Sequence, residues 1–255
     1  MTGWREFGRE LDFWGEAGRQ ATFWWRDDDA VEDTPALARL LELRARLDVP
    51  MAVAVIPARA DDSLARSLAR DPRAEILQHG WAHQSYAPDP RAKSELGRDR
   101  PVAAVMDDLA VGRGRLDTLF GEGWHPIVVP PWNRIDPAVV AALPDAGYLG
   151  VSTMGARPSR DAAPGLWRVN VHLDPIEWRT TRGFAGDDTV LAAALDHLCR
   201  RRAGTADADE PTGLMTHHLA HDDGCWAFIE QFLAVTTTHP AARWIGARRA
   251  FGLDR

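Results

Sequence analysis

The sequence has few cysteines, no long apolar run and no excess of basic residues. Cys199 and Cys225 are its two cysteines and form no CxxC pair, so no disulfide framework is expected. No run of about 18 apolar residues occurs, which excludes a transmembrane helix. Lys and Arg number 30 against 37 Asp and Glu, and this net charge of −7 argues against binding to nucleic acid or anionic lipid. Charges recur through the first 20 residues, so no signal peptide is expected and the predicted location is the cytoplasm.

The composition of the chain is typical of a soluble globular protein. Its 255 residues are 45% hydrophobic and 26% charged, enough to bury a sizeable core. No linker or repeat divides the chain, so we expect one domain over residues 1–255. The sequence does not indicate an oligomeric state.

Short apolar runs alternate with amphipathic segments along the chain. The apolar runs predict strands at 21–26, 49–57, 74–78, 126–132, 149–153, 166–173 and 212–218. The amphipathic patterns predict helices at 33–47, 63–70, 136–148, 187–202 and 225–235, with another that follows the polar loop 84–101 and ends near Phe120. About seven such alternations favour an α/β fold with a parallel sheet and outer helices. Sites in such folds lie at the carboxyl ends of the strands.

Three polar segments directly follow predicted strands. They are RDDD at 26–29, HGWAH at 79–83 and THHLAHD at 216–222. A parallel barrel would bring all three to the same rim.

The HGWAH segment places His79 and His83 four residues apart. If the segment is helical, both imidazoles lie on one face, where one divalent ion can bridge them. Two surface histidines are the alternative. The residue after the first histidine is Gly80 where a zinc protease needs Glu, which argues against that class. His217 and His221 form a second HxxxH pair that competes for the same role.

The RDDD segment places three carboxylates at the end of one strand. Such a cluster needs a cation, an arginine or open water to relieve its repulsion, and a solvated turn is the alternative. Arg26 is a possible counter-charge. If one aspartate binds a metal ion and its neighbour does not, the free one is a candidate general base.

These motifs together resemble the polysaccharide deacetylase family, also named NodB-homology or carbohydrate esterase family 4. The segment EILQHGWAHQ at 75–84 is similar to a strand followed by the family's H-(S/T)-x-x-H motif. VVPPWNR at 128–134 resembles its R-x-P-(Y/W) motif, and GLMTHH at 213–218 resembles the strand that ends in its catalytic histidine. LDPIEW at 173–178 is a weaker match to a motif with Asp and Trp. The resemblance spans about residues 20–235 and implies an irregular (β/α)7-type barrel.

The resemblance also implies metal and proton-transfer roles for particular residues. His79, His83 and Asp29 are implied as metal ligands, and Asp28 as the general base. The alternative register uses Asp27 as base and Asp28 as ligand. His217 is the implied acid with His218 as its alternate; strand alternation points these two in opposite directions. The implied cofactor is a divalent ion, Zn²⁺ first, with Co²⁺, Ni²⁺ or Fe²⁺ as alternatives.

Further residues are implied to line the substrate site. Trp132 would form a wall and offer its main-chain N–H to an oxyanion, beside Pro131, and Trp81 and Arg134 are added candidates. The family's arginine is Val129 here, so Arg26 or Arg134 would have to orient the base.

The implied activity is metal-dependent hydrolysis of the N-acetyl amide of a carbohydrate. Two alternatives stay open at this stage. One is a carbohydrate-binding protein without activity on the same fold, suggested by the missing arginine. The other is an amidohydrolase that acts on a small amide other than a sugar.

Overall fold

The computed structural model describes residues 3–254. The α-helices are α1 (Trp4–Glu16), α2 (Pro35–Arg46), α3 (Asp62–Leu68), α4 (Val102–Phe120), α5 (Pro137–Ala142), α6 (Asp187–Ala203), α7 (Asp223–Thr238) and α8 (Ala247–Ala250). The strands are β1 (Ala21–Ala30), β2 (Met51–Val55), β3 (Ala74–His79), β4 (Trp124–Val129), β5 (Gly150–Val151), β6 (Asp161–Ala163), β7 (Leu166–Arg168), β8 (Thr212–Thr216) and β9 (Ala242–Trp244). Short 3₁₀ turns include η1 (Pro90–Ala92), η2 (Gly121–Gly123), η3 (Pro131–Asn133), η4 (Pro144–Ala146) and η5 (His218–Ala220).

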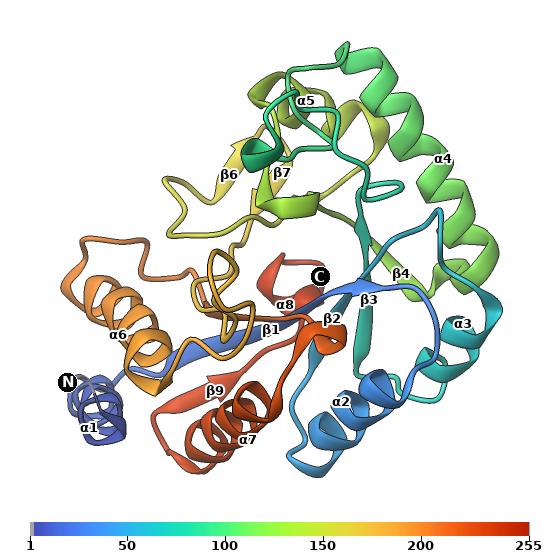
Figure 1. The fold of residues 1–255 in the computed structure, drawn as a ribbon. Coiled ribbons are helices and arrows are strands. Elements are labelled where there is room, and N and C mark those ends of the chain that lie inside the picture. Colours follow the sequence, from blue (N-terminus) through green and yellow to red (C-terminus); the bar gives the residue numbers. More distant parts are fainter. Residues whose placement is uncertain (1–2, 255) are drawn as a thin grey trace.

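The strands form a mostly parallel sheet with helices around its outside (Figure 1). Their order is β6-β7-β5-β4-β3-β2-β1-β8, and β9 pairs with the start of β1. The β6–β7 hairpin is antiparallel, and the other strand pairs are parallel. This arrangement confirms the predicted α/β class.

Main-chain hydrogen bonds join the two ends of this path into a ring. The chain after β7 continues along β5, where Val171 N–H donates to the carbonyl of Thr153 at 3.0 Å. It then reaches β8, where Leu173 N–H donates to Gly213 and Met215 N–H donates back to Leu173. Segment 166–173 therefore closes the sheet into an irregular seven-stranded barrel, which agrees with the (β/α)7-type barrel that the resemblance implies.

Two apolar layers hold the barrel together. The outer layer fills the space between strands and helices; in α2 it includes Leu37 and Leu40, which are fully buried. The inner layer fills the barrel, where Trp24 of β1 packs edge to face against Phe251 after α8 at 6.0 Å between ring centroids. Since Phe251 also lies against Gly150, the C-terminal segment plugs the barrel end opposite the strand carboxyl termini.

Several element boundaries differ from the sequence-based expectation, and α1, β6, β9 and α8 were not predicted. Strand β1 runs through all three aspartates to Ala30, although the prediction ended it at Arg26. The predicted strand 126–132 ends at Val129, because Pro130 and Pro131 lack the N–H that a central strand needs. The predicted helix 136–148 breaks into α5 and η4 at Pro144. Within residues 3–254, no helix combines the length and the apolar character needed to cross a bilayer.

Candidate metal and active site

The polar segments meet at one end of the barrel. Strands β1, β3, β4 and β8 run parallel around it, so their carboxyl ends share an edge. This edge carries the aspartates of β1, His79 at the end of β3, the Pro131–Asn133 turn after β4, and His217 after β8.

A bulge in β1 directs two neighbouring aspartates toward this end. Asp27 pairs with Val53 and Ala30 with Val55, so three steps along β1 match two along β2. The extra residue lies at Asp28–Asp29, where Asp29 adopts a left-handed backbone with φ of 75°. Because the bulge breaks strict alternation, Asp28 and Asp29 need not face opposite sides of the strand.

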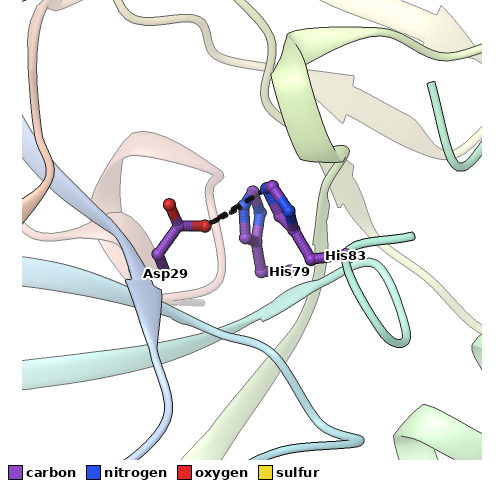
Figure 2. Close-up of side chains that lie close together, drawn as sticks. All are labelled: Asp29, His79 and His83. Carbon is purple, nitrogen blue, oxygen red and sulfur yellow. Dashed lines mark ion pairs between the residues drawn. The ribbon is translucent and has the colours of Figure 1, made fainter. Parts of the chain in front are cut away.

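Asp29 directs its carboxylate at two neighbouring imidazoles from one side (Figure 2). Its Oδ1 is 3.1 Å from His79 Nε2 and 3.3 Å from His83 Nε2, and within the described residues this buried oxygen has no partner besides these two nitrogens. Burial opposes ionisation of Asp29, but the hydrogen bond from His79 and the neighbouring histidines hold its pKa below the usual range. The carboxylate therefore faces both rings as an anion.

The hydrogen bonds of His79 fix which nitrogen faces Asp29. Nδ1 lies 2.9 Å from the carbonyl oxygen of Val129, which can only accept, so Nδ1 carries the proton. In a neutral ring Nε2 then presents a lone pair toward Asp29, which is the tautomer of a metal-ligating histidine. Without an ion, a proton must fill this place: burial lowers the pKa of His79, but Asp29 and Asp28 outweigh it and raise the pKa. The three residues thus fit a divalent cation, with two nitrogens and one oxygen directed at one point.

The segment between these two histidines is a loop and not a helix. His79 ends β3, and Gly80 and His83 have positive φ values of 57° and 55°. The chain curls back in a tight loop, which brings the His79 and His83 rings to 5.2 Å between centroids. The spacing indicated proximity correctly, but through a loop.

Arg26 binds Asp28 with both ends of its guanidinium. Nε lies 2.8 Å from Asp28 Oδ1 and Nη2 lies 2.9 Å from Oδ2, and the two side chains are 0% and 2% exposed. Arg26 also donates to Ser152 Oγ at 2.6 Å and to Asn133 Oδ1 at 2.7 Å. Residues 26 and 28 are two apart on one strand and share a face. Of the two arginines proposed to replace the residue at position 129, Arg26 is therefore the one that holds this carboxylate.

The other candidate arginine lies elsewhere. Arg134 is exposed and donates to the main-chain carbonyls of Arg91 and Lys93. The expectation that it could orient the base is wrong, because its guanidinium is held by these carbonyls of the 84–101 loop.

The side chains of Asp27 and His218 pair with each other. Asp27 Oδ2 lies 2.5 Å from His218 Nδ1, and Oδ1 accepts from the Thr216 hydroxyl at 2.7 Å. Both side chains are buried. Burial opposes the shift, but His218 and Thr216 lower the pKa of Asp27. This pair ties β1 to the turn after β8, and the alternative register that places Asp27 in the site has no support from its position.

His217 lies on the site side of the same turn. Its ring contacts Trp178 at 4.8 Å between centroids, and the Trp178 indole donates to Asp174 Oδ2 at 2.7 Å. Burial raises the pKa of Asp174 while His217 opposes this, and His217 also lowers the pKa of Asp29. Asp174 was missed as a site residue, although the weak LDPIEW match pointed to its segment.

The second HxxxH pair does not form a ligand pair. His221 Nε2 accepts from the main-chain N–H of His217 at 3.1 Å, so one of its nitrogens is already used. Burial lowers the pKa of His221 to about 4.

Aromatic and proline side chains lie beside the His83 loop. The Trp132 ring packs 4.2 Å from the His83 ring, and Trp132 has a φ of 56°, which turns the chain sharply after Pro131. Pro131 is buried, and Trp132 and Trp81 are half-buried.

A second histidine–carboxylate group exists in the described chain. His172, His197 and Glu210 are buried, and both Nε2 atoms lie 3.5 Å from Glu210 Oε2. His172 Nδ1 accepts the N–H of Gly213 at 2.9 Å, so the proton of the neutral ring sits on Nε2. An N–H rather than a lone pair then faces Glu210, and this group does not fit a metal ion.

Comparison with known proteins identifies the architecture. No family model and no curated protein matches the chain. Solved structures do match: a protein described as a polysaccharide deacetylase from Mycobacterium smegmatis has a TM-score of 0.63 at 17% identity, covering 92% of this chain and 90% of that one. The chain has the polysaccharide deacetylase fold. The resemblance drawn from its motifs is thus confirmed at the level of the fold.

Two further structures show the range of proteins with this fold. A family 4 acetyl xylan esterase from Clostridium thermocellum, solved with a cobalt ion, matches with a TM-score of 0.56 at 15% identity over 91% of each chain. A peptidoglycan deacetylase from Bacillus subtilis matches with a TM-score of 0.57 at 11% identity, over 92% of this chain and 91% of that one. Proteins named as an esterase and as a deacetylase thus share this fold.

Proposed function

We propose that this chain is a metal-dependent deacetylase that hydrolyses the N-acetyl amide of a carbohydrate. The observation that carries the proposal is the convergence of Asp29, His79 and His83 beside a second carboxylate, Asp28, that is held by Arg26. One carboxylate can bind an ion while its neighbour stays free to move protons. The polysaccharide deacetylase fold supports the choice of reaction.

The ligand set favours a borderline divalent ion. Two imidazole nitrogens and one carboxylate oxygen suit Zn²⁺ first, with Co²⁺, Ni²⁺ or Fe²⁺ as alternatives. Such an ion supplies Lewis acidity toward an acyl oxygen and lowers the pKa of water.

Asp28 is proposed as the general base. Each of its oxygens accepts one N–H from Arg26, and a carboxylate has further lone pairs free to accept a proton from water. Arg26 is buried and held by Ser152 and Asn133 as well, so it fixes the orientation of Asp28. Positioned proton transfer of this kind contributes about 10²–10⁴-fold to a rate.

His217 is proposed as the general acid. An amine leaves poorly as an anion, so its nitrogen must be protonated as the C–N bond breaks. His217 lies at the site end of β8, close enough to Asp29 and Asp174 to alter the pKa of both. Its contact with Trp178, which is itself bonded to Asp174, holds the ring in place.

The neighbouring walls suit a sugar. Trp132 stands beside His83, and an indole can stack on the apolar C–H face of a pyranose ring. Its main-chain N–H, after the turn at Pro131, is the proposed donor to the oxyanion.

The test combines metal analysis with release of acetate from N-acetylglucosamine oligomers. The wild-type protein is expected to bind one Zn²⁺ and release acetate. Asp28→Asn and His217→Ala should keep the metal and lose at least about 100-fold in kcat, because each removes one proton transfer. His79→Ala should lose the metal.

A matched control is His125→Ala. His125 lies at the start of β4, at the other end of the barrel, and should be replaceable without loss of metal or turnover. Equal activity in the three site variants, or a wild-type protein that binds no divalent ion, would contradict the proposal.

A further inference from the structure

Glu95 lies buried beneath the loop that carries His83. It comes from the polar segment 84–101, yet its side chain is 1% exposed. Its Oε1 accepts the main-chain N–H of Ala82 at 2.8 Å, and Oε2 accepts that of Trp81 at 3.2 Å. One carboxylate therefore binds two consecutive amides of the loop between His79 and His83.

The backbone of this loop leaves room for that carboxylate. A Cβ atom at Gly80 would lie 2.1 Å from Glu95 Oε2, closer than atoms can approach. Gly80 also has a φ of 57°, which favours glycine. The carboxylate of Glu95 thus fills the space that a side chain at position 80 would need.

Three other main-chain groups of the loop also have hydrogen-bond partners. Gly80 N–H donates to Val129, the Gly80 carbonyl accepts from Gln78 Nε2 at 3.1 Å, and the Trp81 carbonyl accepts from Ala58 N–H. Glu95 supplies what these neighbours do not, an acceptor for the main-chain amides of Trp81 and Ala82.

We propose that Glu95 is a positioning residue that holds the His83 loop in its metal-binding shape. This inference rests on the proposed metal site. A ligand from a loop costs ordering free energy on binding unless the loop is already held, and outer-shell partners of ligands commonly change metal affinity. Since Glu95 is buried and its carboxylate accepts hydrogen bonds from the main chain of the loop, it acts through His83 and not on substrate.

The chain contains a close structural match that serves as a control. Glu75, at the other end of β3, also accepts two consecutive main-chain amides, those of Ala247 and Arg248. A Cβ at Gly246 would lie 2.3 Å from Glu75 Oε2, just as one at Gly80 would meet Glu95. Burial is the largest influence on both carboxyl groups and raises both pKa values. The two glutamates differ in which loop they hold.

The experiment is a titration with Zn²⁺ against a competing chromophoric chelator. Glu95→Gln keeps the shape of the side chain but turns an NH₂ group toward one of the two amides, so the Zn²⁺ dissociation constant should rise about 10–100-fold. Glu75→Gln makes the same change at the far end of the barrel and should leave Zn²⁺ affinity unchanged. Glu95→Asp, which keeps both oxygens, should fall between wild type and Glu95→Gln and serves if the latter fails to fold.

The outcomes separate the two proposals. If wild-type protein binds no Zn²⁺, the proposed metal site fails. If wild type binds Zn²⁺ and Glu95→Gln binds it as tightly, the positioning role is overturned while the site stands. An equal loss of affinity in Glu75→Gln would also overturn it, because the effect would then reflect general loss of stability.

Discussion

At the scale of single residues, the three consecutive aspartates of β1 each have a different partner. Asp27 binds His218, Asp28 binds Arg26, and Asp29 faces two histidines. Position 129 holds valine where the family motif has an arginine, and Arg26, two residues before Asp28, holds the Asp28 carboxylate instead. A buried pair of this kind is costly to break, because the remaining charge has no water to solvate it.

Removal of the buried arginine tests this dependence. Arg26→Met should lower the free energy of unfolding by about 3–5 kcal/mol, since Asp28 is left buried without its partner. The double variant Arg26→Met with Asp28→Leu should recover at least half of the loss, because it removes the unpaired charge. Urea unfolding of both variants measures this. A single variant as stable as wild type would show that Asp28 does not depend on Arg26.

At the scale of elements, the sequence predicted most strands and helices of the barrel well, and its loops and the strand bulge poorly. Within residues 21–235, the order of strands and helices apart from β6 followed from periodicity, which reports burial directly; 166–173 was predicted as a strand, but its role in closing the barrel was not. The loop form of 79–83 did not follow, because four-residue spacing suits a helix and a tight loop equally. The bulge at Asp29 depends on pairing with β2, and the contact of Glu95 with Trp81 depends on tertiary packing, so neither has a local sequence signal.

Close packing inside the barrel predicts a sharp penalty at Gly150. A Cβ there would lie 2.4 Å from Phe251 and 3.0 Å from Ile127, so Gly150→Ala should destabilise the protein by about 1–3 kcal/mol through overpacking. Gly114 of α4 is exposed with nothing near its Cβ position, and Gly114→Ala should stabilise by about 0.5–1 kcal/mol. Thermal unfolding compares the two. Equal effects of the two alanines would mean that Phe251 does not fill the barrel end.

At the scale of the whole molecule, buried titratable groups connect stability to pH. His197 contacts Thr212 of β8 and faces Glu210, His172 and Arg201. Burial, with the nearby His172 and Arg201, lowers its pKa to about 4 although Glu210 opposes this. Burial of Glu210 is outweighed by the bonds it accepts, and its pKa falls to about 2. The folded protein thus keeps His197 neutral and Glu210 charged.

Acid should therefore destabilise the fold in two stages. The unfolded chain protonates His197 near its ordinary pKa of 6.5, so this contribution is full above that value and is lost as pH falls from 6.5 to 4. The contribution of Glu210 is lost between 4.5 and 2. Urea unfolding at pH 7 and pH 5 should show a loss of about 2 kcal/mol from His197, reduced in His197→Asn. A wild-type stability that does not change over this interval would contradict the assignment.

The bulge at Asp29 also affects how the sequence of this chain can be aligned with those of other proteins. Asp27, Asp28 and Asp29 are consecutive and identical, so a sequence alignment shifted by one position here can match aspartate to aspartate just as well. In space such a slip would exchange a ligand for a base or for a partner of His218. The three solved structures described above are 11–17% identical to this chain, so equivalent positions in this strand have to be assigned by superposition of backbones and not by sequence alignment.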